Sequence, residues 1–373
     1  DKLLSSKSTA NSNNYYSEIL EPIFFEILNK KLEDRNHKYQ TELFSFIPFL
    51  NGGLFSPGPS DFYDKTNNNK RININNSWFK EFFKILEIYN FTIDENSVYD
   101  TEISVDPEML GRIFENLLAA EINPETMSSA RQESGSFYTP REIVDYMAEE
   151  SLSNKIIKDT NLNSKKIQEL LSYNFKDEDE VDFTEEEKIQ IINSLDNTKI
   201  LDPACGSGAF PIGILQKIFF VLNKIDSDNK IWINAKTKNL EPELRKKFNE
   251  QNLNYVKKLN ILRKNIYGID IQPTATEISK LRCFLTLLVD QTISQDEPNH
   301  GIEQLPNLEF KFVTADSLGQ LPQLQLTKQT KMFEDTQESL AQEKFIIKKF
   351  DEIQNLISQY FTENYKQEIK PQY

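Results

Sequence analysis

Cysteine is scarce in this sequence, and long apolar runs are missing from it. The 373 residues include two cysteines, Cys205 and Cys283, which are too few for a disulfide framework and suit a reducing compartment. No run approaches the roughly 20 consecutive apolar residues that a membrane-spanning helix needs, and the first residues show no signal-peptide pattern. We therefore expect a cytoplasmic protein with no membrane partner.

Basic residues are outnumbered, because 43 Lys and Arg face 58 Asp and Glu and the formal net charge is −15. This balance argues against the chain by itself being a sequence-independent nucleic-acid-binding protein, although a local basic groove is compatible with it. The two histidines, His37 and His300, stand in polar stretches without neighbouring ligands, so no metal site is predicted. The length and the 38 % hydrophobic content indicate a globular protein with room for two domains.

The first third of the sequence predicts helices. Two segments, 15–35 and 76–91, repeat apolar residues at helical spacing. The residues that should share a buried face are Ile19, Ile23, Ile27 and Leu28 in the first segment and Phe79, Phe82, Phe83 and Leu86 in the second. A third helix is predicted over 104–122, and a turn-rich connector follows it. We therefore expect a helical N-terminal domain over 1–125 and a second domain over 126–373.

Short apolar strands begin to alternate with helices near Lys199. The sequence predicts one strand that ends at Asp202, one that ends at Asp270, and a third, alternating strand over 308–313. This order predicts an α/β fold with a parallel, doubly wound sheet, which binds its ligands at the carboxyl ends of the strands. In the helix after the second strand, the residues that should share a face are Ile278, Leu281, Leu285 and Leu288.

Two Thr-x-x-Glu patterns predict helix starts. One runs from Thr139 to Glu142, with Pro140 as the first helical residue, and the other from Thr274 to Glu277. In such a capping box the threonine hydroxyl and the glutamate each accept a backbone N–H that the helix leaves unpaired. We therefore expect a capping box at the start of both helices.

The turn after the first strand, in ILDPACGSGAF (200–210), has two glycines that let the backbone bend tightly and approach a ligand. A nucleoside triphosphate loop is excluded, because no Gly-Lys-Ser/Thr follows. A dinucleotide fingerprint is disfavoured, because Pro211 stands where a third small residue is needed. The pattern that remains is an acid, three residues and Gly-x-Gly, represented by Asp202, Gly206 and Gly208.

These segments resemble a known family. DPACGSGAF, preceded by SGSFYTPREIVDYM, is similar to the cofactor-binding half of Eco57I-like N6-adenine DNA methyltransferases, which occur as single-chain restriction-modification and phage-defence enzymes. IPFLNGGLFS and DPEMLGRIFENLL resemble the helical region that these enzymes carry before the catalytic core. The resemblance covers most of the chain up to about Ser317, and four segments in the same order are more specific than any one of them.

The resemblance implies a partial Rossmann-like, class I methyltransferase core that binds S-adenosyl-L-methionine. The segment that ends at Pro140 would face the methionine carboxylate, an anion that a helix N-terminus favours by about 0.3–1 kcal/mol. Asp202 would lie near the methionine ammonium, Asp270 would accept from the ribose hydroxyls, and Ile271 would pack against the adenine. The expected cofactor-binding residues are Phe137, Tyr138, Thr139, Pro140, Asp202, Pro203, Ala204, Cys205, Gly206, Ser207, Gly208, Phe210, Asp270, Ile271, Asp316 and Ser317.

Two of these assignments carry a qualification. Asp270 lies 270 − 208 = 62 residues after Gly208, whereas a plain dinucleotide fingerprint expects about 20. The resemblance therefore requires inserted helices between the two residues. Asp316 resembles the acid that binds the adenine amino group in the family, but it could equally cap the helix that follows it.

The family's base-binding motif, Asn/Asp-Pro-Pro-Tyr/Phe, is absent from this sequence. In the family this motif holds the flipped adenine and follows the strand after the one that ends near Asp316. We therefore expect the motif beyond Tyr373 and no catalytic residue within the chain. The sequence, which does not begin with methionine, is expected to be a fragment that binds the cofactor without transferring its methyl group. Double-stranded DNA would be bound by the full-length protein.

Two questions stay open at this point. The Glu-x-Lys fragments in 185–188 and 368–370 do not follow an aspartate on a strand, so they do not indicate a nuclease, but a fused nuclease domain or a separate nuclease subunit is compatible with the resemblance. Two other functions also fit the glycine turn. One is a non-catalytic assembly module that binds the cofactor, and the other is a methyltransferase that acts on RNA or protein.

Overall fold

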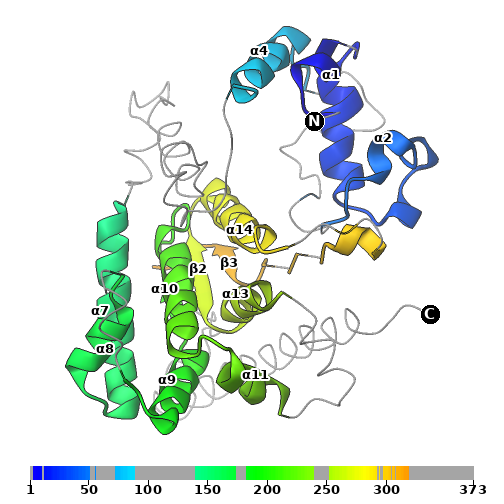
Figure 1. Cartoon of the computed structure of the whole chain (residues 1–373). Coiled ribbons are helices and arrows are strands. Elements are labelled where there is room, and N and C mark those ends of the chain that lie inside the picture. Colours follow the sequence, from blue (N-terminus) through cyan, green and yellow to red (C-terminus); the bar gives the residue numbers. More distant parts are fainter. Residues whose placement is uncertain are drawn as a thin grey trace, which may run out of the picture. The chain divides into compact units, whose positions relative to one another are not determined.

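Figure 1 shows the structure of the chain, a computed structural model. It describes residues 3–10, 12–50, 55, 72–88, 139–173, 182–238, 252–291, 294, 297–303, 305–306 and 308–318. The chain divides into two compact units, one made of 1–239 and 249–317 and the other of 240–248 and 318–373. All described residues except Leu318 belong to the first unit. The boundary expected near residue 125 lies outside the described residues and stays a prediction.

Three short strands form a parallel sheet in the order β1-β2-β3 (Figure 1). Their bounds are Ile200–Asp202 for β1, Ile266–Asp270 for β2 and Phe312–Thr314 for β3. Ile200 pairs with Ile266 and Gly268 pairs with Phe312. The predicted α/β class with a parallel sheet is confirmed, and the carboxyl ends of all three strands lie at one edge.

The third strand begins later than its alternating sequence predicts. It starts at Phe312, whereas the prediction started at Leu308. The N–H groups of Lys311 and Phe312 both donate to the Leu308 carbonyl, at 2.9 and 3.0 Å. This turn occupies the first residues of the alternating stretch, so only its end reaches the sheet.

Helices cover one face of the sheet. α10 (Ala209–Ile225), α13 (Leu253–Lys264) and α14 (Pro273–Leu288) contact β2, and Phe312 is buried on this face. Leu201 alternates to the opposite face, where 58 % of its surface is exposed. A further layer, α7 (Arg141–Thr160), α8 (Ser164–Leu171) and α9 (Glu185–Asn197), packs against α10 (Figure 1). No helix among the described residues is long and apolar enough to cross a membrane.

The buried face of α14 is not the one that its apolar spacing predicts. Ile278, Leu281, Leu285 and Leu288 are only partly buried. The fully buried residues include Thr276, Ser279 and Cys283. Polar side chains share the buried surface of α14 with Phe284 and Leu287, and they bind neighbouring segments, as in the 2.8 Å contact between the hydroxyls of Thr276 and Thr314 on β3.

The described residues before position 89 are largely helical, which agrees with the predicted helical region. Their elements are α1 (Ser6–Ala10), the π-helical turns η1 (Tyr16–Leu20) and η2 (Ile23–Ile27), the 3₁₀ turns η3 (Leu32–Asp34) and η4 (His37–Tyr39), α2 (Glu42–Ser45) and α4 (Asn76–Leu86). Ile23 and Ile27 pack with Leu3 and Phe44, while Phe79 and Phe83 pack with Tyr15. Phe82, predicted to share that buried face, is 41 % exposed and stacks on Trp78 instead.

Hydrogen bonds between distant parts of the sequence join this helical region to the segment after α14. The Asn299 side chain donates to the Phe49 carbonyl at 2.8 Å and accepts the Phe49 N–H at 2.6 Å. His300, in the 3₁₀ turn η7 (Pro298–Gly301), places its Nε2 3.0 Å from the Ser45 carbonyl. These contacts tie the segment after α14 to the helical region.

Neither predicted capping box forms. α7 begins at Arg141 with Pro140 as its N-cap, so Thr139 lies one residue too early to cap it. α14 begins at Pro273, so Thr274 lies inside the first turn. A capping box forms instead at Thr184, in the acidic stretch before α9. The Thr184 hydroxyl accepts the Glu187 N–H at 3.2 Å, and the Glu187 carboxylate accepts the Thr184 N–H at 2.9 Å.

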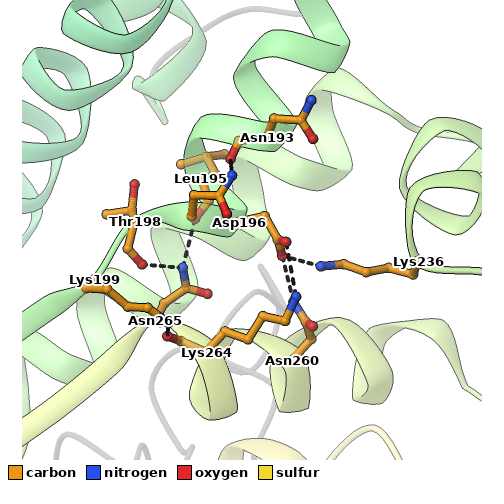
Figure 2. Close-up of polar contacts among 10 residues, drawn as sticks. Asn193, Leu195, Asp196, Thr198, Lys199, Lys236, Asn260, Lys264 and Asn265 are labelled. Carbon is orange, nitrogen blue, oxygen red and sulfur yellow. Dashed lines mark hydrogen bonds and ion pairs between the residues drawn. The ribbon is translucent and has the colours of Figure 1, made fainter. Parts of the chain in front are cut away.

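A polar cluster joins α9 to α11 (Lys230–Thr237) and α13, as Figure 2 shows. Asp196 at the end of α9 binds Lys236 of α11 and both Asn260 and Lys264 of α13. Burial alone would raise the pKa of Asp196, but hydrogen bonds and charges from Lys236 and Lys264 outweigh it, so the pKa lies below its ordinary value. Burial also lowers the pKa of Lys236, to about 8.

Asn265, at the start of β2, completes the same cluster. Its side-chain amide donates to the Leu195 carbonyl at 2.8 Å and to the Thr198 carbonyl at 2.7 Å (Figure 2). These bonds give the Leu195 carbonyl a second donor besides the Thr198 N–H and pair the carbonyl of Thr198, the C-cap residue of α9. They also set the position of β2 beside β1.

Replacing Asp196 by alanine should lower the free energy of unfolding by about 1–3 kcal/mol near pH 7, because two lysines lose their partner. Since the native pKa of Asp196 lies below its unfolded value, its stabilisation is complete above about pH 4 and is lost as the pH falls through the native pKa. Urea unfolding of wild type and D196A should therefore converge on acidification. A difference that stays constant down to about pH 3 would contradict this assignment.

Candidate functional site

The carboxyl ends of β1 and β2 bring two carboxylates to the same edge of the sheet. Asp202 ends β1, and Asp270 ends the neighbouring β2. Burial raises the pKa of Asp202, the Ala204 N–H opposes this from 3.1 Å, and the negative charge of Asp270 adds to the rise. This edge of the sheet therefore brings two carboxylates together where water has only partial access.

The two carboxylate oxygens of Asp202 have different surroundings. Oδ1 accepts the Ala204 N–H, whereas Oδ2 is buried and accepts no hydrogen bond within the described part of the chain. A buried acceptor without a donor costs about 1–3 kcal/mol, and more when it is charged. A ligand that brought a donor, above all a cationic one, would remove this cost.

Asp270 is held by two backbone N–H groups. Its Oδ2 accepts from Gly206 at 2.8 Å, and its Oδ1 accepts from Gln272 at 2.9 Å. Each carboxylate oxygen can accept a second hydrogen bond. Asp270 therefore ties the turn after β1 to the segment after β2 and keeps acceptor capacity for a ligand.

The two glycines of the turn face different surroundings. Gly206 and Gly208 both adopt left-handed backbone angles, with φ of 53° and 88°. A Cβ at Gly206 would meet no atom within 4 Å, whereas one at Gly208 would lie 2.9 Å from the Ser279 hydroxyl oxygen. The turn is therefore open at Gly206 and packed against α14 at Gly208.

Two buried side chains of α14 bind the carbonyls of this turn. Ser279 donates from its hydroxyl to the Gly206 carbonyl at 2.9 Å. Arg282 donates from Nη1 to the Ser207 carbonyl at 2.8 Å. The sequence motifs did not single out either residue, because neither belongs to the Gly-x-Gly pattern and both break the apolar spacing of the helix.

The start of α7 lies beside the start of α10. A Cβ at Gly213, in the second turn of α10, would lie 2.2 Å from Cγ1 of Val144 in the first turns of α7. This contact requires glycine, and it brings Pro140 and the first N–H groups of α7 toward the helix that follows the glycine turn. The N-cap residue, Pro140, does not cap these N–H groups with its side chain.

The other expected residues fall into two groups. Pro203, Ala204, Ile271, Asp316 and Ser317 are exposed, with Ile271 at 63 %, whereas the side chains of Cys205 and Ser207 are buried. Burial, followed by the charges of Asp202 and Asp270, raises the pKa of Cys205 to about 12. Its thiol points inward, since a Cβ on Gly268 of β2 would lie 2.9 Å from Sγ.

Asp316 and the aromatic segment before α7 complete the list of expected residues. Asp316 follows Ala315, whose N–H donates to the Asp270 carbonyl at 2.9 Å, so Asp316 lies at the same edge as the glycine turn. Phe210 is partly buried in the first turn of α10. Phe137 and Tyr138 lie outside the described residues, so their placement stays a prediction.

Alanine at the two glycines should have unequal effects on stability. Gly208→Ala should lower the free energy of unfolding by about 2–4 kcal/mol, because left-handed strain adds to a clash with Ser279. Gly206→Ala should cost about 1 kcal/mol, because only the strain applies. Chemical denaturation of both variants would measure the difference. Equal losses, or a larger loss at Gly206, would contradict the described geometry.

Comparison with known proteins agrees with the motifs. Residues 264–370 match the sequence model of the Eco57I restriction-modification methylase family. A protein of Methanocaldococcus jannaschii, described as a candidate type II restriction enzyme and methyltransferase, is 29 % identical over 323 residues. The match covers 82 % of this chain and 24 % of that relative, so the chain spans about a quarter of its length. No solved structure gives a significant match. The resemblance indicated by the sequence is thus confirmed over residues 264–370, which are similar to the Eco57I restriction-modification methylase family.

Proposed function

We propose that this chain is the S-adenosyl-L-methionine-binding part of an adenine-specific DNA methyltransferase from a restriction-modification or phage-defence system. The observation that carries the proposal is the buried Oδ2 of Asp202, which accepts no hydrogen bond from the described residues and belongs to the acid that ends β1 just before the glycine turn. The family match over 264–370 supports a methylase, and the open space at Gly206 leaves room for a ligand beside the turn. When bound, this cofactor supplies an electrophilic methyl group.

Asp202 suits the amino-acid end of the cofactor. An α-ammonium group placed at Oδ2 would satisfy the buried acceptor and neutralise charge beside Asp270. The carboxylate of the same amino acid would take the uncapped N–H groups at the start of α7, near Pro140. The absence of the predicted capping box favours this arrangement, because Thr139 does not occupy those donors.

Asp270 suits the ribose. Acids at the end of the second strand of such sheets accept hydrogen bonds from ribose hydroxyls, and both oxygens of Asp270 keep acceptor capacity beside their backbone partners. The apolar, exposed side chain of Ile271 adjoins it and offers a surface for the adenine ring. Asp316, at the same edge, would accept from the adenine amino group or cap the segment after it.

The sheet order supports a Rossmann-like core. Read from one edge, the strands run 3-2-1, which is one half of the doubly wound order. The long interval between Gly208 and Asp270 contains α10, α11 and α13, of which α11 and α13 exceed a plain strand-helix-strand unit. The spacing that departs from the dinucleotide fingerprint therefore has a structural counterpart.

The site that would bind the methyl-accepting adenine is not proposed to lie within this chain. The sequence contains no Asn/Asp-Pro-Pro-Tyr/Phe, and the chain covers 24 % of the relative from M. jannaschii. We propose that the base-binding motif, the contacts with double-stranded DNA and any nuclease belong to further parts of the full-length protein. The chain alone would then bind the cofactor and leave DNA unmethylated.

Asp202→Asn should weaken binding of S-adenosyl-L-methionine by roughly tenfold to a hundredfold, because one charge-assisted hydrogen bond is lost. Calorimetric titration of wild type and D202N would measure this, with the exposed Asp228→Asn as a matched control that binds like wild type. No heat from wild type at millimolar cofactor would contradict the proposed function.

The same substitution should stabilise the ligand-free chain by about 1 kcal/mol near pH 7, because a buried, partly unsatisfied charge disappears. Since the native pKa of Asp202 is raised, wild type should lose stability relative to D202N as the pH rises above about 4 and through the native pKa. Urea unfolding at several pH values measures this. A destabilised D202N would contradict the assignment of Asp202 as a strained ligand-binding group.

Incubation of the chain with DNA and methyl-labelled cofactor should leave the DNA unlabelled, because the chain has no motif to hold a flipped adenine. Filter retention of the labelled DNA would measure transfer, with an active adenine methyltransferase as the positive control. Appreciable N6-methyladenine made by the chain alone would show that the acceptor site lies within these 373 residues.

A further inference from the structure

We propose that Ser279 and Arg282 of α14 are positioning residues, which hold the glycine turn in its cofactor-binding shape before the cofactor arrives. This inference rests on the proposed function, because it assigns the turn a ligand. It concerns residues outside the Gly-x-Gly motif that do not face the open side of the turn.

The first observation is that two consecutive peptide carbonyls are bound by one helix. The Gly206 carbonyl accepts from the Ser279 hydroxyl at 2.9 Å, and the Ser207 carbonyl accepts from Nη1 of Arg282 at 2.8 Å. Ser279 and Arg282 are three residues apart and therefore lie on the same side of α14. Their exposed fractions are 0 % and 4 %. Water cannot readily replace either donor at these buried positions.

The second observation is that the other side of the Gly206 residue is bound by the neighbouring strand. Its N–H donates to Asp270 at 2.8 Å, while its carbonyl is held by Ser279. Left-handed backbone angles persist where the surroundings enforce them. Gly206 therefore depends on β2 at its N–H and on α14 at its carbonyl.

The third observation is a steric one. The Ser279 side chain also forms the surface on which Gly208 rests, since a Cβ there would lie 2.9 Å from the serine oxygen and 3.2 Å from its Cβ. Contact with Ser279 blocks movement of the turn toward α14. The hydrogen bonds from Ser279 and Arg282 to the turn's carbonyls oppose movement away from it. Its remaining open side is the one at Gly206, where the ligand is expected.

A turn that is held in this way does not have to be ordered when the ligand binds. The ordering cost then falls on folding instead of on binding, which strengthens binding without any added contact. α14 starts at Pro273, three residues after Asp270. The helix that binds the carbonyls of the turn therefore also follows closely the acid that is proposed to bind the ribose. Changes in α14 should therefore alter cofactor affinity even where they touch no cofactor atom.

Thr286 of α14 provides a matched control. It is a buried hydroxyl residue on the same helix, but its hydroxyl donates to the Arg282 carbonyl, one turn earlier in its own helix, at 2.9 Å. Thr286→Val therefore removes a buried hydroxyl from α14 without removing a donor to the turn. Any effect shared by all α14 variants reflects stability alone.

The experiment is a calorimetric titration of S-adenosyl-L-methionine into wild type, S279A, R282K, R282M and T286V, each at a temperature where it is folded. S279A should bind about five- to tenfold more weakly, and R282M about ten- to a hundredfold more weakly. R282K should fall between R282M and wild type, because it keeps one cationic donor. T286V should bind within about twofold of wild type.

Two outcomes overturn the inference while wild type binds the cofactor: S279A and R282M binding like wild type, or T286V losing as much affinity as S279A. If wild type does not bind, the proposed function fails, and amide hydrogen exchange of the ligand-free chain decides the positioning role separately. The turn amides at 206–208 should exchange faster in S279A than in T286V. Equal exchange in the two variants would overturn the positioning role.

Discussion

The hydrogen bond from the Gly206 N–H to the Asp270 carboxylate joins the ends of two parallel strands, and the rest of the site depends on it. The same carboxylate accepts the Gln272 N–H and so also sets the start of α14. One acid therefore joins the end of its own strand and the start of α14 to a turn that lies 64 residues earlier in the sequence. Backbone donors in such a place are fixed by the fold, so they hold the carboxylate in one orientation.

Asp202 presents the opposite case beside it. Its second oxygen is buried and accepts no hydrogen bond within the part of the chain that the structure describes, and burial and the neighbouring charge make its ionised form less favourable. Proteins tolerate such strain where it serves binding, because the ligand supplies what the fold withholds. The two acids at this edge of the sheet thus differ in role. Asp270 holds backbone segments in place, whereas Asp202 keeps one carboxylate oxygen that accepts no hydrogen bond from the described residues.

The sequence predicted the features that depend on local patterns. The ends of β1 and β2 at Asp202 and Asp270 are confirmed, because short apolar runs closed by acids and turns are local signals. The buried face of α14 was predicted wrongly, because apolar spacing cannot reveal a helix that buries hydroxyls and a guanidinium to bind a turn. Both predicted capping boxes failed because α7 starts one residue after, and α14 two residues before, the start that its motif predicts. Ser279 could be found only from coordinates, since its partner lies 73 residues earlier.

The contact between α7 and α10 restricts how this protein can change over evolutionary time. Val144 occupies the space that any side chain at Gly213 would need. A mutation at either position alone would push the two helices apart or leave a void between them. The two sites can drift only together, with a smaller residue at 144 arriving before a larger one at 213. Related sequences that have made this exchange should retain the spacing between the helices while losing the glycine.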